Sequence, residues 1–181
     1  MRVISGKYKK CSLDGYNLEG TRPTMDRIKE SMFALIQDKI KDSICLDLFA
    51  GSGALGIEAL SNGAKCCYFV DNSSLAINTI KKNINSIRVT EPYYVIARDY
   101  KNALKYFQDQ NIKFDLIFLD PPYKFDFINQ VLDFLIKYEL LSDDSIIICE
   151  YESEVFNNEN FIITKERKYG SKKVVVLQKR N

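Results

Sequence analysis

The residues best suited to bind a ligand form a glycine-rich turn after a short apolar run, 44–48. The turn consists of Phe49, Ala50, Gly51, Ser52 and Gly53, and a helical pattern begins directly after it. Gly51 and Gly53 allow a ligand to approach the backbone closely, and the first turn of the following helix presents free N–H groups to the same space. The order strand, turn, helix predicts a binding loop at the carboxyl end of a parallel strand.

Two kinds of adenosine cofactor fit this turn. The spacing Gly51-x-Gly53-x-x-Gly56 matches the dinucleotide-binding motif, with Asp71 at about the expected ~20 residues downstream, so a nicotinamide-dependent oxidoreductase stays open. Asp47 favours S-adenosylmethionine, because a fixed carboxylate repels a pyrophosphate and attracts a ligand that carries an ammonium and a sulfonium. In the alternative interpretation, Asp47 only accepts hydrogen bonds from amides of the turn.

A second motif, Asp120-Pro121-Pro122-Tyr123, follows the apolar run 114–119. Its two prolines hold the backbone in a rigid, extended turn. An exocyclic amine of a nucleobase is a poor nucleophile, because its lone pair is delocalised into the ring. The Asp120 carboxylate and a neighbouring backbone carbonyl can accept its hydrogens and stabilise the developing charge, and Tyr123 can stack on the extruded base. The motif therefore favours methyl transfer to such an amine over a simple strand terminator.

Strands and helices alternate around these motifs. Strands are expected at 44–48, 66–70, 93–97, 114–119 and 145–149. Amphipathic helices are expected from residue 24 to about 39, after the turn at 54–60, from a cap at Asn72 or Ser73 to 87, at 101–108 and at 127–138. This alternation predicts an α/β fold with a mostly parallel sheet. Two last strand-like runs, 161–164 and 173–177, leave no room for a helix and should pair as an antiparallel hairpin.

Four of the expected strands end close to an acidic residue. These residues are Asp47, Asp71, Asp99 and Asp120. Because the carboxyl ends of parallel strands share one edge of the sheet, we expect the four carboxylates to gather at the ligand-binding edge.

Composition excludes several function classes. The 181 residues fit a single domain, 1–181, and a net charge of +2 requires that any binding of nucleic acid use a local patch. The absence of histidine excludes Ser-His-Asp and Cys-His catalysis and histidine-based zinc sites. The five cysteines form no Cys-x-x-Cys pair, which favours core positions over metal ligands. With no apolar run long enough for a membrane span and no signal-peptide core, the cytoplasm is the expected location.

The N-terminal residues 1–20 mix β-like runs with turn signals and predict a basic, hairpin-like extension. Its basic residues, with Tyr8 among them, are Arg2, Lys7, Lys9 and Lys10. They predict either a phosphate-binding arm with an aromatic surface or a solvated hairpin face, and charge alone does not decide between the two. Arg22 and Thr24, at the entrance of the first helix, are further candidates for binding RNA.

Taken together, these motifs resemble the bacterial 16S rRNA guanine-N2 methyltransferases of the RsmD type. The resemblance runs over nearly the whole chain. It is carried by residues 46–53, Asp120-Pro121-Pro122-Tyr123, Arg22-Pro23-Thr24 with Asp26-Arg27, residues 54–64 and Lys168-Tyr169-Gly170. Departures from the family pattern occur at Ser5-Gly6, at 9–12 and at Asn62, where the family commonly has Arg; they affect the expected RNA contacts and leave the catalytic motif untouched.

The resemblance implies a Rossmann-like class I methyltransferase fold of seven strands with an antiparallel C-terminal hairpin. Asp47 and the glycine turn would hold the methionine end of S-adenosylmethionine. Asp71, with Asn72 beside it, would bind the ribose, and Asp99 with Tyr100 would lie by the adenine. The substrate would be a guanine N2 in rRNA of the small ribosomal subunit or its assembly intermediate. We expect a monomer that needs no metal ion and no membrane.

Besides the nicotinamide-dependent oxidoreductase, three other functions stay open. An adenine-N6 methyltransferase on DNA or RNA, or a protein-glutamine methyltransferase, uses the same type of catalytic motif. DNA enzymes of this type generally carry an additional target-recognition domain, which the sequence does not show. A non-catalytic ribosome-assembly factor that kept the fold is the third.

Overall fold

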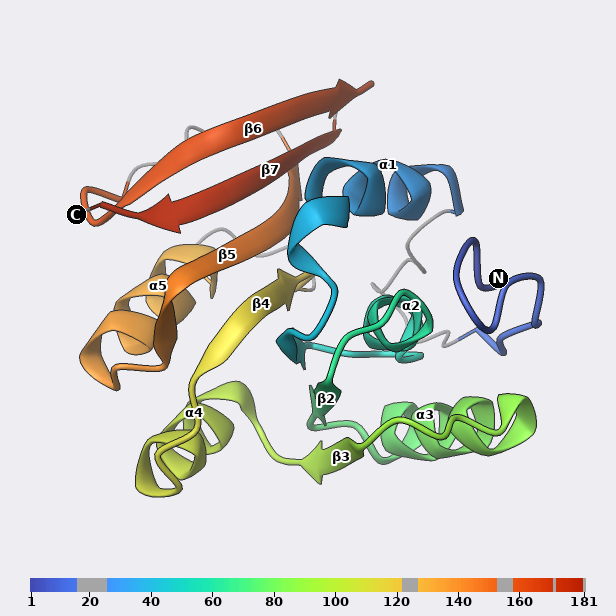
Figure 1. Ribbon diagram of the computed structural model, residues 1–181. Helices are drawn as coiled ribbons and strands as arrows, with labels where there is room; N and C mark the ends of the chain where they lie inside the picture. The colour runs from blue at the N-terminus through green and yellow to red at the C-terminus, as the bar shows by residue number, and fades with distance from the viewer. Residues whose placement is uncertain (16–25, 122–126, 153–157, 171, 181) are drawn as a thin grey trace.

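The fold is built on a seven-stranded sheet with the strand order β3-β2-β1-β4-β5-β7-β6 (Figure 1). The computed structural model describes residues 1–15, 26–121, 127–152, 158–170 and 172–180. The strands are β1 (Ile44–Leu48), β2 (Cys66–Asp71), β3 (Tyr93–Ala97), β4 (Phe114–Leu119), β5 (Leu141–Glu152), β6 (Phe161–Tyr169) and β7 (Lys172–Lys179). The first five run parallel, and β7 is antiparallel to both β5 and β6. The predicted parallel sheet with an antiparallel C-terminal hairpin is confirmed.

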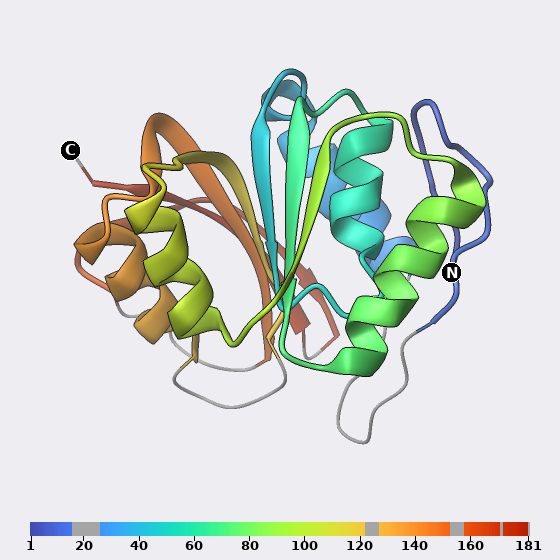
Figure 2. The ribbon, with the colours of Figure 1, turned by 90° about the horizontal axis from the view of Figure 1, so that it is seen from below.

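Helices cover both faces of this sheet. They are α1 (Asp26–Ile36), the short 3-10 helix η1 (Gln37–Lys39), α2 (Ala54–Ser61), α3 (Ser74–Ile87), α4 (Tyr100–Asp109) and α5 (Phe127–Lys137). Figure 2 shows α4 and α5 on one side of the sheet and α1, α2 and α3 on the other. The described helices include none that is long and apolar enough to cross a membrane.

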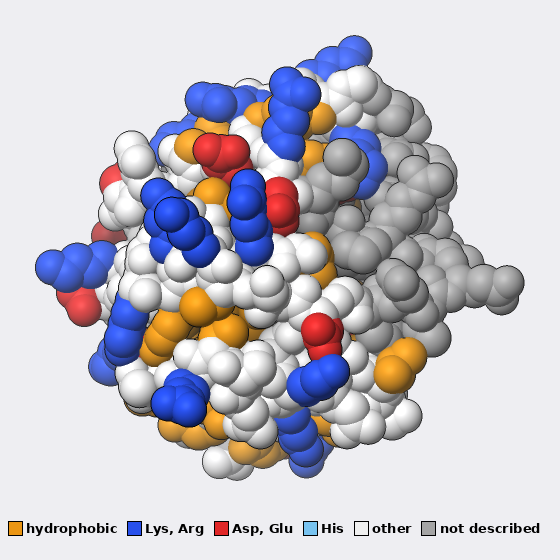
Figure 3. Space-filling model, turned by 90° about the vertical axis from the view of Figure 1, so that its right-hand side faces the viewer, with side chains coloured by type: hydrophobic (Ala, Val, Ile, Leu, Met, Phe, Trp, Pro, Cys, Tyr) orange, Lys and Arg blue, Asp and Glu red, His pale blue; other side chains and the backbone are white. Residues whose placement is uncertain are grey.

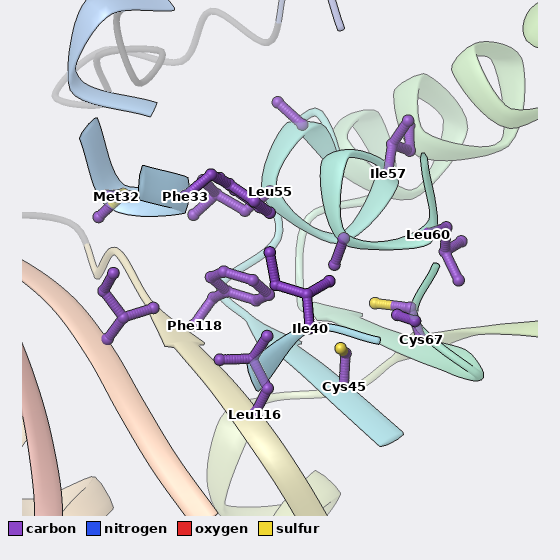
Figure 4. Packing of buried hydrophobic residues seen from close by; sticks show 14 of the residues in the cluster. Met32, Phe33, Ile40, Cys45, Leu55, Ile57, Leu60, Cys67, Leu116 and Phe118 are labelled. Atoms are coloured by element: carbon purple, nitrogen blue, oxygen red, sulfur yellow. The ribbon is translucent and has the colours of Figure 1, made fainter. Parts of the chain in front are cut away.

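Each layer has its own buried apolar cluster, because the central strands are hydrophobic on both faces. In β4, Leu116 and Phe118 face α1 and α2, whereas Ile117 and Leu119 face α4 and α5. Phe33 of α1 stacks on Phe118 with ring centroids 5.5 Å apart, as seen in Figure 4. Successive residues of β4 thus point to opposite faces of the sheet, so residues two positions apart lie on the same face.

The C-terminal hairpin is longer than predicted. β6 continues to Tyr169 and β7 begins at Lys172, with Gly170 between them at a φ of 60°. Residues 165–168 are charged and exposed, so no apolar pattern marks them as strand. Their backbone pairing with β7 at the edge of the sheet extends the strand instead.

The N-terminal residues 1–15 form a tight turn with an antiparallel bridge between Arg2 and Ser12. This segment lies against α2, where the Lys7 N–H donates to the Ser61 carbonyl at 2.8 Å. At Gly6 (φ 75°) an added Cβ would lie 1.9 Å from that carbonyl oxygen, so only glycine fits. Tyr8 does not provide the aromatic surface of the phosphate-binding arm, one of the two interpretations given above, because this residue is 7% exposed and its hydroxyl bonds to Glu91.

A buried ion pair joins this segment to the core. Lys29 Nζ of α1 lies 3.0 Å from Glu58 Oε2 of α2, and both side chains are almost fully buried. The Glu58 carboxylate also accepts hydrogen bonds from the backbone N–H groups of Ile4 and Ser5. The first residues of the chain are therefore part of the packed structure.

Candidate cofactor and catalytic site

The glycine turn and the second motif lie on neighbouring strands. Leu48, the last residue of β1, pairs with Val70 of β2 on one side and with Leu119 of β4 on the other. The turn that starts at Phe49 is therefore flanked by Asp71 and Asp120. Because the strand order reverses between β1 and β4, this is the topological switch point at which open α/β sheets bind ligands.

The backbone of the glycine turn lies largely in the left-handed region. Phe49, Gly51 and Gly53 have φ values of 70°, 55° and 77°. The turn is closed by a hydrogen bond from the Gly53 N–H to the Ala50 carbonyl at 2.7 Å, and Ala50 in turn donates to Val70 of β2 at 2.9 Å. Gly53 is the N-cap of α2, so the free N–H groups of this helix face the turn, as predicted.

Gly56, the third glycine of the motif, serves packing. A Cβ at this position would lie 2.3 Å from Phe69 Cε1 and 2.6 Å from Cys67 Sγ, both on β2. Glycine therefore lets α2 lie directly on the sheet. The third glycine is therefore required by the packing of α2 on β2, and the glycine spacing does not distinguish a dinucleotide from another adenosine cofactor.

Asp47 is buried under the first turn of α2, with 2% of its surface exposed. Its Oδ2 accepts a hydrogen bond from the Gly56 N–H at 2.9 Å. Burial, together with the charges of Asp120 and Asp71, raises the pKa of this carboxyl to about 8, although the hydrogen bond from Gly56 lowers it. One oxygen of Asp47 thus has the amide-acceptor role given above as the alternative; its contact with a cofactor stays a prediction.

Asp71 and Asp99 also bind backbone amides at the same edge. Asp71 accepts from the N–H groups of Gly51 and Ser73, both at 2.9 Å. Asp99 caps α4 by accepting from Lys101 N and Asn102 N, and these bonds lower the pKa of its carboxyl. Asp99 also borders an open depression of about 650 Å³ lined by Asn72, Ala97, Arg98, Asp99, Asn102, Lys105, Tyr106 and Asp109.

An aromatic group lies beside the turn. The ring of Phe49 is 5.5 Å from that of Tyr100 and 6.1 Å from that of Phe127, measured between centroids. The Tyr100 hydroxyl donates to Gln130 Oε1 at 2.9 Å, which fixes the tyrosine ring against α5. The sequence analysis did not name Phe127 as a site residue. Its position at the start of α5, shortly after the second motif, was the signal that could have identified it.

Asp120 and Pro121 follow β4 directly and are both partly exposed. The negative charge of Asp120 raises the pKa of the Asp47 carboxyl and of the buried Cys149 thiol. The Asp120 carboxylate therefore lies near Asp47 of β1 and near Cys149 of β5. Pro122 and Tyr123 lie outside the described residues, as do Arg22 and Thr24.

Asn83 is a further residue that sequence reasoning missed. Its Nδ2 donates to the Ser52 carbonyl at 2.9 Å and to the Asp14 carbonyl at 3.1 Å, while its Oδ1 accepts from the Asp14 N–H at 2.8 Å. One buried amide thus joins α3, the glycine turn and the N-terminal segment. A polar residue three positions after Ile80, on the apolar face of α3, was the available signal.

The predicted RNA-binding cations of the N-terminal segment differ in their surroundings. Lys7 Nζ lies 2.7 Å from Glu91 Oε1, and this hydrogen bond raises the pKa of Lys7. Arg2 Nε lies 3.7 Å from Asp26, whereas Lys9 and Lys10 are exposed. Figure 3 shows that Lys and Arg side chains on this side of the molecule have Asp and Glu among them. RNA binding by these four residues stays a prediction.

Known proteins share both sequence and fold with this chain. A family model described as Conserved hypothetical protein 95 matches residues 1–178. The Haemophilus influenzae protein named Ribosomal RNA small subunit methyltransferase D (RsmD) is 37% identical over 94% of this chain and 89% of its own length. The chain belongs to the RsmD family. The Escherichia coli RsmD is 30% identical over 85% of this chain and 76% of its own length.

Solved structures agree with membership of the RsmD family. The Escherichia coli methyltransferase yhhF superposes with a TM-score of 0.85 and 27% identity, over 99% of this chain and 97% of that one. A methylase from Haemophilus influenzae gives a TM-score of 0.79 and 32% identity, over 99% and 98%. The resemblance drawn from the motifs and the methyltransferase fold are both confirmed.

Proposed function

We propose that this protein transfers the methyl group of S-adenosylmethionine to the exocyclic N2 amine of a guanine in 16S rRNA of the small ribosomal subunit, acting as a monomer in the cytoplasm. The observation that carries the proposal is the placement of Asp120-Pro121 beside the glycine turn, on neighbouring strands at the switch point. The names of the RsmD relatives support rRNA of the small subunit as the substrate.

The residues at the edge of the sheet fit this cofactor better than a dinucleotide. The carboxylate of Asp71 contacts the turn, and that of Asp99 lies at the same edge of the sheet, where its hydrogen bonds lower its pKa. Asp71 suits the ribose of either kind of adenosine cofactor, whereas the second acid, Asp99, adds negative charge that disfavours a pyrophosphate. The rings of Phe49 and Tyr100 offer a surface for the adenine. The cofactor supplies an electrophilic methyl group on its sulfonium.

Asp120 and the backbone that follows it prepare the amine. The carboxylate and a carbonyl of the rigid Asp-Pro-Pro turn accept the two N2 hydrogens, which directs the nitrogen lone pair toward the methyl group. The N2 nitrogen gains a methyl group and loses one proton, and we expect Asp120 to accept this proton. The other contribution is positioning of the two reactants in line. None of these steps needs histidine.

The direct test is transfer of labelled methyl from S-adenosylmethionine to small subunits from cells that lack this protein. Nucleoside analysis should yield N2-methylguanosine. Label in N6-methyladenine or in methylglutamine would instead favour one of the two alternative enzymes, and subunit binding without any cofactor dependence would favour an assembly factor.

Asp120→Asn should reduce transfer about 10²- to 10³-fold, because one acceptor of the amine hydrogens is lost. Affinity for S-adenosylhomocysteine, measured by calorimetry, should change little. Asp38→Asn, which removes an exposed carboxylate 3.8 Å from Lys165, is the matched control. Loss of cofactor binding together with transfer would overturn the role given to Asp120.

A further inference from the structure

A buried glutamate lies next to the catalytic motif on the other side from the glycine turn. Leu119 of β4 pairs with Cys149 of β5, so the next residues, Asp120 and Glu150, are neighbours on adjacent parallel strands. Parallel strands lie about 4.8 Å apart. The Glu150 side chain is 5% exposed.

Glu150 and Asp120 face the same side of the sheet. In β5, Ile146 and Ile148 pack in the cluster beneath α1 and α2, as Phe118 does in β4. Residues two positions apart on a strand share a face, so Glu150 and Asp120 continue this side. Asp47 lies on it too, two residues after Cys45 of the same cluster.

The Glu150 carboxylate is only partly satisfied. Oε1 accepts a hydrogen bond from Lys172 Nζ of β7, whose side chain is 17% exposed. Oε2 is buried and has no hydrogen-bond partner in the part of the chain that the structure describes. A buried carboxylate oxygen without a donor is costly, and the cost is recovered when a ligand supplies the donor. The Glu150–Lys172 pair thus offers an unused acceptor beside a cation.

The Watson–Crick edge of guanine matches this pair. Next to the N2 amine, guanine carries the N1–H donor and then the O6 acceptor, whereas adenine carries an N1 lone pair and an amino group. Enzymes that modify extruded bases recognise them by hydrogen bonds to this edge. We propose that Glu150 accepts the N1–H of the target guanine and that Lys172 faces its O6, which makes the pair the base-selecting element; this inference rests on the proposed function.

Bracing of β5 against β7 is the competing explanation for the pair. Strand β6, on the other side of β7, offers a matched control in Glu166, which lies 3.6 Å from Lys173 of β7 and is exposed. Glu166→Gln therefore removes a carboxylate that also pairs with a lysine of β7 but lies on the strand farther from Asp120. A bracing role predicts that Glu150→Gln lowers the melting temperature and reduces transfer to every substrate alike.

The test uses rRNA in which the mapped target guanine is replaced by 2,6-diaminopurine through ligation, assembled into small subunits. This base keeps the N2 amine but has a lone pair at N1 and an amino group in place of O6. The wild-type protein should prefer guanine by about tenfold or more. In Glu150→Gln the preference should fall about tenfold, because the Gln amide can donate to the N1 lone pair. Glu166→Gln should keep the wild-type ratio.

Each result is decisive. A wild-type protein that methylates both bases equally, or a Glu150→Gln protein that keeps the wild-type ratio, would overturn the inference while N2-methylguanosine still forms. If Glu150→Gln does not fold, Lys172→Met serves instead, and an unchanged ratio there overturns the inference as well. Absence of N2-methylguanosine with wild-type protein would overturn the proposed function first.

Discussion

Two buried Lys–Glu pairs, one between α1 and α2 and one between β5 and β7, are used differently. In the first, Glu58 is fully engaged by Lys29 and by the backbone N–H groups of Ile4 and Ser5. In the second, Glu150 is engaged through one oxygen by Lys172, and its other oxygen has no partner among the described residues. The difference indicates that the first pair belongs to the scaffold and the second to a binding surface.

The physical basis of this distinction is the cost of burying charge. A buried ion pair repays its desolvation only when further hydrogen bonds satisfy the remaining oxygens. Glu58 meets that condition within the protein. For Glu150, the second oxygen needs a hydrogen-bond donor from a bound ligand, and Glu150 lies next to Asp120 at the edge of the sheet where we propose that the substrate binds.

Breaking the first pair should give the largest effect. Lys29→Met leaves Glu58 as an uncompensated buried charge, and we expect a loss of about 3–5 kcal/mol in the free energy of unfolding. Urea titration measures this loss. Lys105→Met, at an exposed i,i+4 pair with Asp109, should cost less than about 0.5 kcal/mol. A loss below about 1 kcal/mol in Lys29→Met would contradict the scaffold role of Glu58.

Asp47 is a third buried acid, and it accepts a hydrogen bond from the backbone N–H of Gly56. Its pKa is about 8 in the folded protein and 3.8 without burial. Between these values the unfolded chain has released the proton and the folded protein has kept it, so stability falls as the pH rises, by up to ~1.4 kcal/mol per pH unit. Unfolding titrations from pH 5 to pH 8 should show this slope, and Asp47→Asn should flatten it. An equal slope in both proteins would mean that Asp47 is ionised when folded.

Removing the second pair altogether should have the smallest effect on stability. In the double variant Glu150→Leu with Lys172→Met, two apolar side chains replace a pair that is not fully satisfied, so the free energy of unfolding should change by about 1 kcal/mol or less. The same urea titration checks this. A loss as large as that of Lys29→Met would assign both pairs to the scaffold.

Much of the site followed from local patterns in the sequence. The apolar runs before Asp47, Asp71 and Asp120 are strands, and each of these acids lies at the expected edge. Such features depend on neighbours in the chain: a run of branched residues, a glycine turn, a cap such as Ser73 before α3. They could be predicted because the physics that produces them is local.

What the sequence did not reveal depends on contacts between distant residues. Lys29 and Glu58 are ordinary charged residues of helical segments until α1 and α2 pack together. Tyr8 has the neighbours of an exposed aromatic residue, yet it packs against a loop more than eighty residues later. Glu150 lies in an apolar run that gave no reason to single it out, and only the β4–β5 register places it beside Asp120.

The contact between the first residues and α2 also sets an order for folding during synthesis. Ile4 and Ser5 leave the ribosome early, but their acceptor is Glu58, more than fifty residues behind them. Chains grow at roughly 5–20 residues per second, so the N-terminal segment waits for seconds before its binding site exists. Until α2 arrives Lys29 stays solvated, and the packing of α2 against α1 then removes it from water.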